Sequence, residues 1–226
     1  MQERRIKKSA AIYTPLILML YDWWVLGISN RFAWKCPTRS VLLPFFCRHV
    51  SVRHMDVGVG TGFYLANAKL KSGTEVTLLD LNRNSLHAAQ ARIRHMHPQS
   101  IQHDIMMPLP VGHRVFDSIS LFYLLHCLPG NFSEKENVVI NIKRQLSPDG
   151  VLFGATILGE DANHNRFGKK LMALYNRKGI FGNQSDTMQG LRAMLERNFR
   201  NVDIRQHGKV ALFTARDAAV RYSHSK

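Results

Sequence analysis

The chain has 226 residues, of which 45% are hydrophobic and 21% are charged. These proportions are typical of one folded domain with a buried core, and they exclude a disordered chain. The 31 Lys and Arg residues against 16 Asp and Glu residues give a formal net charge of +15, which favours anionic small molecules, anionic lipid surfaces or nucleic acid as partners. The basic residues are dispersed without an arginine-rich tract, so an ordinary solvated surface explains the charge equally well.

The first 50 residues are predicted to form a helical cap. Ala10–Ser29 is mostly apolar and follows the basic Met1–Lys8, which superficially resembles a signal anchor. Thr14-Pro15 and Asp22 interrupt this stretch, and its aromatic residues lie centrally and not at its two ends. We therefore expect a helix that packs on the domain and does not span a membrane, with contact to a membrane surface left open.

The three cysteines, Cys36, Cys47 and Cys127, contain no CxxC pair. Their odd number and their spacing argue against a disulfide framework and against a structural zinc site. The sequence therefore predicts a protein without a metal centre, in the reducing cytoplasm.

From residue 51 to residue 226, short apolar runs alternate with helical patterns such as Ser85–Met96 and Glu134–Gln145. This alternation predicts a second segment that is one α/β domain, with a doubly wound, Rossmann-like and mostly parallel sheet of seven strands. Only three residues separate the last two runs, so a hairpin should place one antiparallel strand in the sheet. A polar, helical region around 158–185 is predicted to be a lid-like insertion. The expected strands are Val52–Val57, Glu75–Leu79, Ser100–Gln102, Ser118–Phe122, Gly150–Thr156, Asn201–Gln206 and Val210–Ala215.

A glycine loop follows the first expected strand, with Gly58, Gly60 and Gly62 in the spacing Gly-x-Gly-x-Gly and Asp56 two residues ahead. Dinucleotide-binding loops usually have the spacing Gly-x-Gly-x-x-Gly and direct a helix N-terminus at a pyrophosphate, beside which a carboxylate is unfavourable. A carboxylate is favourable beside a ligand with an ammonium and a sulfonium. The loop spacing thus disfavours an NAD-dependent oxidoreductase, and the missing Walker lysine excludes a P-loop NTPase. A simple tight turn is the alternative.

At this loop the chain resembles the class I S-adenosylmethionine (SAM)-dependent methyltransferases of the small-molecule type. The resemblance covers about Val52 to Phe213, with four motifs in the family's order. It implies SAM as cofactor and S-adenosyl-L-homocysteine (SAH) as product, with Asp56 at the methionine end of SAM, directly or through water. Capping of the loop amides is the other interpretation of Asp56.

The later motifs imply further contacts with the cofactor. In the family, an acid after the second strand accepts both ribose hydroxyls and the next apolar side chain lies against adenine, which maps to Asp80 and Leu81. An acid after the third strand takes the adenine amino group and its neighbour packs on the ring, which maps to Asp104 and Ile105. Asp80 as a helix N-cap and Asp104 as an exposed loop acid are the alternatives.

The segment after the fourth expected strand resembles the part of the family that lines the methionine end of SAM and faces the acceptor, which maps to Phe122 and Tyr123. His126 follows and is the candidate general base, although a histidine here also occurs in the family as a structural element of the helix start. His164 and Tyr175 are weaker candidates.

The aromatic side chains of the cap predict a pocket for a hydrophobic or aromatic small-molecule acceptor, with Tyr13, Tyr21 and Trp24 as candidate contacts. Ordinary packing of the cap is the alternative. The sequence leaves open whether oxygen, nitrogen or carbon is methylated, and it leaves the oligomeric state open.

Two other functions compete with a small-molecule methyltransferase. The charge of +15 keeps a nucleic-acid methyltransferase open, for instance one acting on RNA, although no Asn/Asp-Pro-Pro-Tyr/Phe segment and no Pro-Cys nucleophile pair is present. A non-catalytic SAM-binding protein of the same fold is the second alternative, against which the intact glycine loop and Asp80 argue.

Overall fold

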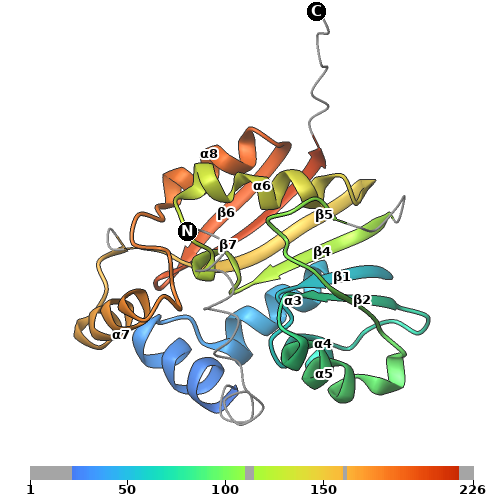
Figure 1. Ribbon diagram of the computed structural model, residues 1–226, viewed down its shortest axis with the longest axis horizontal. Coiled ribbons are helices and arrows are strands. Elements are labelled where there is room, and N and C mark those ends of the chain that lie inside the picture. Colours follow the sequence, from blue (N-terminus) through green and yellow to red (C-terminus); the bar gives the residue numbers. More distant parts are fainter. Residues whose placement is uncertain (1–21, 110–114, 160–161, 219–226) are drawn as a thin grey trace, which may run out of the picture.

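A seven-stranded sheet forms the centre of the computed structural model, which describes residues 22–109, 115–159 and 162–218 (Figure 1). The strand order is β3-β2-β1-β4-β5-β7-β6. Neighbouring strands pair in parallel from β3 to β5, whereas β7 is antiparallel to both β5 and β6. The strands are β1 (Arg53–Val57), β2 (Glu75–Asp80), β3 (Gln99–Gln102), β4 (Phe116–Phe122), β5 (Leu146–Ile157), β6 (Phe199–His207) and β7 (Val210–Ala218).

The predicted Rossmann-like sheet and its C-terminal hairpin are confirmed, and the expected strands differ from the observed ones mainly at one place. β5 begins at Leu146 and not at Gly150, and β4 begins at Phe116 and not at Ser118. Phe116 pairs with Leu146, after which the register shifts at a bulge before Ser118. The bulge therefore lets the two strands pair upstream of the expected strand starts at Ser118 and Gly150.

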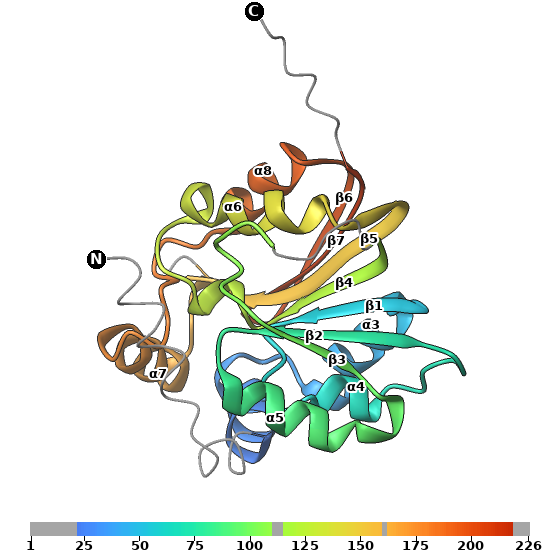
Figure 2. The same cartoon turned by 45° about the vertical axis from the view of Figure 1, so that its right-hand side comes forward.

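Helices cover both faces of the sheet (Figures 1 and 2). Helices α6 (Phe132–Lys143) and α8 (Met188–Glu196) lie on one face, and α3 (Leu43–His49), α4 (Phe63–Asn67) and α5 (Arg83–Arg92) lie on the other. Because successive strand residues point to opposite faces, β4 contributes Ile119 and Leu121 to the core under α6 and Phe122 to the core under α3.

The N-terminal region, as far as it is described, is part of the main core. Helices η1 (Asp22–Ala33) and η2 (Thr38–Leu42) lead into α3, which places Phe46 against Phe122 with 5.3 Å between ring centroids. Helix η1 also packs on α7 (Arg166–Arg177), and Asn165 Nδ2 donates a hydrogen bond to Phe32 O at 2.8 Å. The rest of the predicted cap, including Tyr13 and Tyr21, lies outside the described residues. No helix in the described ranges is both long enough and apolar enough to cross a membrane.

A buried ion pair fastens the segment between α7 and α8, which includes the end of the predicted lid. Lys135 Nζ on α6 donates to Asp186 Oδ2 at 2.6 Å and to Gly182 O at 3.0 Å, and the side chains of Lys135 and Asp186 are both fully buried. Asn183 Nδ2 adds a hydrogen bond to Ile157 O at the end of β5. These contacts fix the segment beside the carboxyl ends of the strands.

We predict that Lys135→Met lowers the free energy of unfolding by about 3–5 kcal/mol, because it leaves the Asp186 carboxylate buried without its partner. The double variant Lys135→Met/Asp186→Leu should recover most of this loss. Urea denaturation followed by circular dichroism measures both effects. A double variant as unstable as the single one would show that packing and not charge pairing explains the loss.

Candidate cofactor and active site

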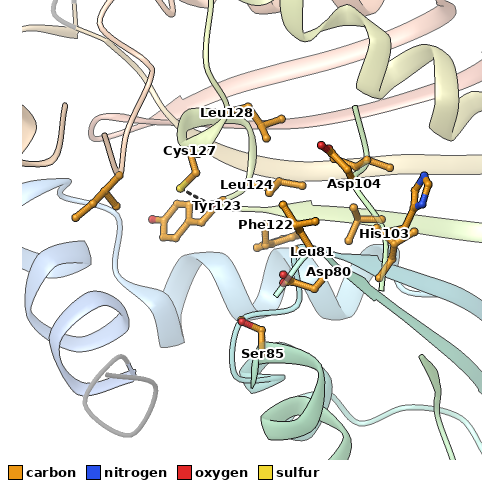
Figure 3. Close-up of a pocket in the computed structure, with 16 residues that line it drawn as sticks. Asp80, Leu81, Ser85, His103, Asp104, Phe122, Tyr123, Leu124, Cys127 and Leu128 are labelled. Carbon is orange, nitrogen blue, oxygen red and sulfur yellow. Dashed lines mark hydrogen bonds between the residues drawn. The ribbon is translucent and has the colours of Figure 1, made fainter. Parts of the chain in front are cut away.

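A cleft opens at the carboxyl ends of the parallel strands, where the strand order reverses between β1 and β4 (Figure 3). Open α/β sheets bind ligands at this switch point. Most of the predicted cofactor residues line the cleft. They are Gly58, Gly60, Asp80, Leu81, Asp104, Ile105, Phe122 and Tyr123.

The glycine loop brings the backbone close to this cleft. Gly58 and Gly60 have φ angles of +75° and +53°, which a side chain strongly disfavours, and Gly58 N donates to Leu79 O at 2.8 Å. A Cβ at Gly58 would lie 3.0 Å from the Leu124 side chain. The loop therefore needs glycine both for its conformation and for space.

Gly62 has a different role from the one that the sequence predicted. It also has a left-handed φ, of +72°, but it caps α4 and does not line the cleft. A Cβ at this position would lie 3.0 Å from the Ala89 backbone of α5. Its position shows that Gly62 allows α4 and α5 to pack closely.

Asp80 ends β2 with its carboxylate in the cleft (Figure 3). Its Oδ1 accepts a hydrogen bond from Asn82 N at 2.8 Å. Asn82 and not Asp80 is the N-cap of α5, so the alternative interpretation of Asp80 as a cap is wrong. Burial raises the pKa of Asp80 to about 6, although backbone N–H groups, including that of Gly60, oppose the rise. A half-buried carboxylate of this kind can accept hydrogen bonds from hydroxyl groups of a ligand.

Asp104 and Ile105 follow β3 on the same side of the cleft. Asp104 Oδ1 accepts from Met106 N at 2.9 Å, which fixes the turn, and Ile105 is buried. Asn141 of α6 donates to the carbonyl oxygens of Ile105 and Met107, each at 2.9 Å. Asn141 thus holds this loop, a role that the helical pattern alone could not reveal.

Asp56 borders a smaller hollow that adjoins the cleft and shares Gly58 and Tyr123 with it. The side chain is buried, which raises its pKa to about 6, and the Ser120 hydroxyl opposes this rise by donating to Asp56 Oδ1 at 2.5 Å. The hollow therefore carries the buried Asp56 carboxylate, whereas the larger cleft carries the half-buried carboxylates of Asp80 and Asp104.

His126 does not line the cleft and is buried beneath it. Its Nδ1 accepts from Ile157 N at 3.3 Å, and its ring packs against Phe181 with 4.6 Å between centroids. Burial lowers its pKa to about 3. This geometry favours the structural interpretation of His126 over general-base catalysis. His164 is likewise buried and contacts the carbonyl oxygen of Gly159 at 2.8 Å.

Tyr123 has a left-handed backbone, with φ of +59°, directly at the end of β4. Such strain in a residue other than glycine is uncommon and often marks a functional site. Cys127 lines the cleft beside it, with 3.6 Å between its Sγ and Tyr123 O (Figure 3).

Apolar side chains from η1 and from the segment after α7 also border the site. Leu26 of η1 borders the smaller hollow, and Ile180 after α7 borders the cleft. Trp24, a predicted acceptor contact, lines neither. Its Nε1 donates to the Tyr175 hydroxyl at 2.8 Å and so links η1 to α7. Within the described ranges, no group of three or more His, Cys, Asp or Glu residues could hold a metal ion.

The described residues fit SAM. Gly58 and Gly60 of the glycine loop border both the half-buried Asp80, which can receive hydroxyl donors, and the buried Asp56, which can receive a cation. The apolar side chains of Leu81 and Ile105 can pack on an adenine ring.

Comparison with known proteins identifies the family. Residues 55–154 match a family model described as a methyltransferase domain. The uncharacterized Escherichia coli protein YbcY is 48% identical over 196 residues, which cover 84% of this chain and 98% of that protein. A physcion biosynthesis cluster O-methyltransferase from Aspergillus chevalieri is 40% identical over 210 residues, which cover 92% of this chain and 95% of that protein. This chain belongs to the methyltransferase family.

Solved structures agree with this assignment at the level of the fold. The SAH complex of DhpI matches with a TM-score of 0.67 at 13% identity, over 96% of this chain and 98% of that chain. The resemblance to class I enzymes is thus confirmed, and the protein is a SAM-dependent methyltransferase. Which residues hold the cofactor stays a prediction.

We predict that Asp80→Asn weakens SAH binding about 100-fold while the methyltransferase stays folded, because hydrogen bonds to a charged acceptor contribute roughly 1.5 kcal/mol each and the ribose offers two. Isothermal titration calorimetry measures the change. Asp149→Asn is the matched control, since Asp149 is an exposed acid in β5 that does not line the cleft. Unchanged affinity in Asp80→Asn would refute the ribose contact.

Proposed function

We propose that this methyltransferase moves a methyl group from SAM to the hydroxyl oxygen of a small, hydrophobic aromatic acceptor. The observation that carries the proposal is the cleft, in which a buried acid and a glycine cradle adjoin apolar side chains from η1 and from the segment after α7. The 40% identity to an enzyme named as an O-methyltransferase supports oxygen as the methylated atom.

The cofactor would lie along the carboxyl ends of four strands. Asp80 would accept the ribose hydroxyls, Leu81 and Ile105 would enclose adenine, and Asp104 would accept from its amino group. The ammonium would lie at Asp56. Phe122 and Tyr123 would line the methionine part of the cofactor, at the switch point between β1 and β4.

SAM supplies a methyl group on a sulfonium, which is already an activated leaving group. The chain therefore contributes chiefly by aligning the acceptor in line with the methyl group and by excluding water. Because His126 is buried with its Nδ1 occupied by a backbone N–H, we assign it no proton transfer. An aromatic hydroxyl suits such a site because phenols ionise near pH 10, far more readily than aliphatic alcohols. The acceptor would lose its proton to solvent and react as the phenolate, which takes the methyl group as SAH leaves.

The acceptor would lie between η1 and the segment after α7. Leu26 and Ile180 face the site from these elements, and the Trp24–Tyr175 hydrogen bond joins the elements behind them. Tyr175 packs against Phe181 with 5.0 Å between ring centroids, and neither side chain lines the cleft or the smaller hollow. The apolar wall of Leu26 and Ile180 suits a flat hydrophobic acceptor.

A small-molecule acceptor also explains the data better than RNA, because the relative with a named activity belongs to a biosynthesis cluster. We place the reaction in the cytoplasm, since no disulfide joins Cys36, Cys47 or Cys127, all of which are described. Contact with a membrane surface stays a prediction.

To test the proposal, the protein is incubated with labelled SAM and a panel of hydroxylated aromatic compounds and, in a separate reaction, with labelled SAM and total RNA. We expect label in an organic-soluble product whose new methyl group is bonded to oxygen, as shown by mass spectrometry and nuclear magnetic resonance. Label confined to RNA would overturn the small-molecule assignment, and a methyl group on nitrogen or carbon would overturn O-methylation.

We predict that Tyr175→Phe raises the KM of the acceptor about two- to tenfold and leaves the KM of SAM unchanged, because it removes the hydrogen bond that joins the two walls of the acceptor site. Steady-state kinetics with each substrate varied in turn measures both constants. Trp23→Phe is the control, since Trp23 is adjacent to Trp24 but 65% exposed. An unchanged acceptor KM in Tyr175→Phe would place the acceptor elsewhere.

A further inference from the structure

A row of polar side chains lies buried in the aromatic core on the α3 side of the sheet. His54 and Asp56 on β1 stand opposite Ser118 and Ser120 on β4, in parallel register. All four side chains are buried, and the ring of Phe46 on α3 packs on His54 with 5.6 Å between centroids. Polar groups in such surroundings are stable only when they bond to one another.

The four side chains form a continuous chain of hydrogen bonds that ends at Asp56. Ser51 N donates to Ser118 Oγ at 2.8 Å, and Ser118 Oγ lies 2.8 Å from His54 Nδ1. His54 Nε2 lies 3.2 Å from Ser120 Oγ, which donates to Asp56 Oδ1 at 2.5 Å. The chain thus runs along the strands from the start of β1 to the smaller hollow of the site.

One assignment of protons satisfies every bond in this row. A serine hydroxyl has one proton, and where that of Ser120 goes to Asp56, Ser120 accepts from His54 Nε2. Burial lowers the pKa of His54 to about 3, although a hydrogen bond with the Ser118 backbone opposes the fall, so its ring is neutral and in this tautomer its Nδ1 carries no proton. Nδ1 must therefore accept from the Ser118 hydroxyl, which accepts from Ser51 N. Each donor points toward Asp56.

We propose that His54, Ser118 and Ser120 are positioning residues that keep the buried Asp56 carboxylate ionised and oriented to receive the ammonium group of SAM. The inference rests on the proposed function, in which Asp56 contacts that ammonium. Aligned hydrogen bonds polarise one another in the same direction, so the chain strengthens the final donor at the carboxylate. Ser120 touches Asp56, and His54 and Ser118 act through it.

The other charged and titratable groups around Asp56 do not take this role. Asp80 on β2 raises the pKa of Asp56 by repulsion. Across the glycine loop, Arg92 of α5 is paired with Asp22 of η1 at 2.7 Å, and both contact Thr61. From α4 and from the end of β4, Tyr64 and Tyr123 border the same hollow. The Ser120 hydrogen bond is the interaction that lowers the pKa of Asp56 against burial.

Two ligands separate this role from a merely structural one. SAH carries the ammonium, whereas 5′-methylthioadenosine keeps the adenosine part and lacks the amino-acid end. Calorimetry on the full chain from about pH 5 to pH 8 measures the affinity of each ligand. The ratio of the two affinities reports the ammonium contact. The titration of Asp80 cancels in this ratio, because both ligands carry the ribose. In the wild type we expect this ratio to fall as the pH drops through about 6, where Asp56 takes up its proton.

In Ser120→Ala the midpoint of this fall should move upward by about one pH unit, because the donor that favours the charged form is lost. SAH affinity at pH 7 should drop a few-fold, with 5′-methylthioadenosine affinity unchanged. His54→Leu should shift the midpoint in the same direction, and His54→Gln, which retains a donor and an acceptor, should restore it. Thr156→Val is the matched control, since its buried Oγ1 on β5 has no hydrogen-bond partner among the described residues.

The outcomes are distinguishable. If Ser120→Ala and His54→Leu weaken both ligands equally and leave the midpoint in place, the polar row is structural and the proposal is wrong. If the wild type binds 5′-methylthioadenosine as tightly as SAH at every pH, the contact between Asp56 and the ammonium fails, and the proposed cofactor placement fails with it. Retained 5′-methylthioadenosine binding in each variant shows that its pocket is folded.

Discussion

The site of this methyltransferase is built around two carboxylates, the buried Asp56 and the half-buried Asp80, at the edge of an apolar sheet. Burial raises the pKa of each from 3.8 to about 6, which corresponds to about 3 kcal/mol per group in the ligand-free protein. The folded state holds these protons more tightly than the unfolded chain, so their contribution to stability falls as the pH rises from about 4 to about 6. At neutral pH both carboxylates are therefore ionised against the cost of desolvation, which the hydroxyl donors and the cation of the proposed ligand would offset.

The sheet topology brings hydrogen-bond donors close to the two carboxylates, and these donors offset part of the cost of removing them from water. The parallel register between β1 and β4 places Ser120 opposite Asp56, and the glycine loop turns the backbone N–H of Gly60 toward Asp80. Both arrangements use the switch point of the sheet, where β1 is flanked by β2 and β4. The same loop must also clear Leu124 and Ala89, so Gly58 and Gly62 are required for different reasons. The same close contacts of the glycine loop are therefore needed both for the fold and for the shape of the site.

Local sequence patterns were sufficient to predict the sheet and the positions of the acidic residues at its edge. A strand, the glycine turn after it and the residue that ends a strand are each defined by consecutive residues. They could not reveal the hydrogen-bonded row, since Ser118 and Ser120 come 64 residues after His54 and Asp56. The alternations His-x-Asp and Ser-x-Ser would have suggested it once β1 and β4 were assumed to be neighbours. The role of His126 was undecided for the same reason, because burial depends on residues such as Phe181 that follow much later.

The two halves of the proposed site would be built by different means. The cofactor half would use backbone groups and side chains at strand ends, whose positions the sheet fixes. The acceptor half would use side chains of η1 and of the segment around α7, which meet through Trp24 and Tyr175. A substitution at Leu26 or Ile180 changes the apolar wall without moving a strand, because these residues lie outside the sheet. Acceptor specificity can therefore vary while the buried carboxylates, and with them cofactor recognition, stay in place.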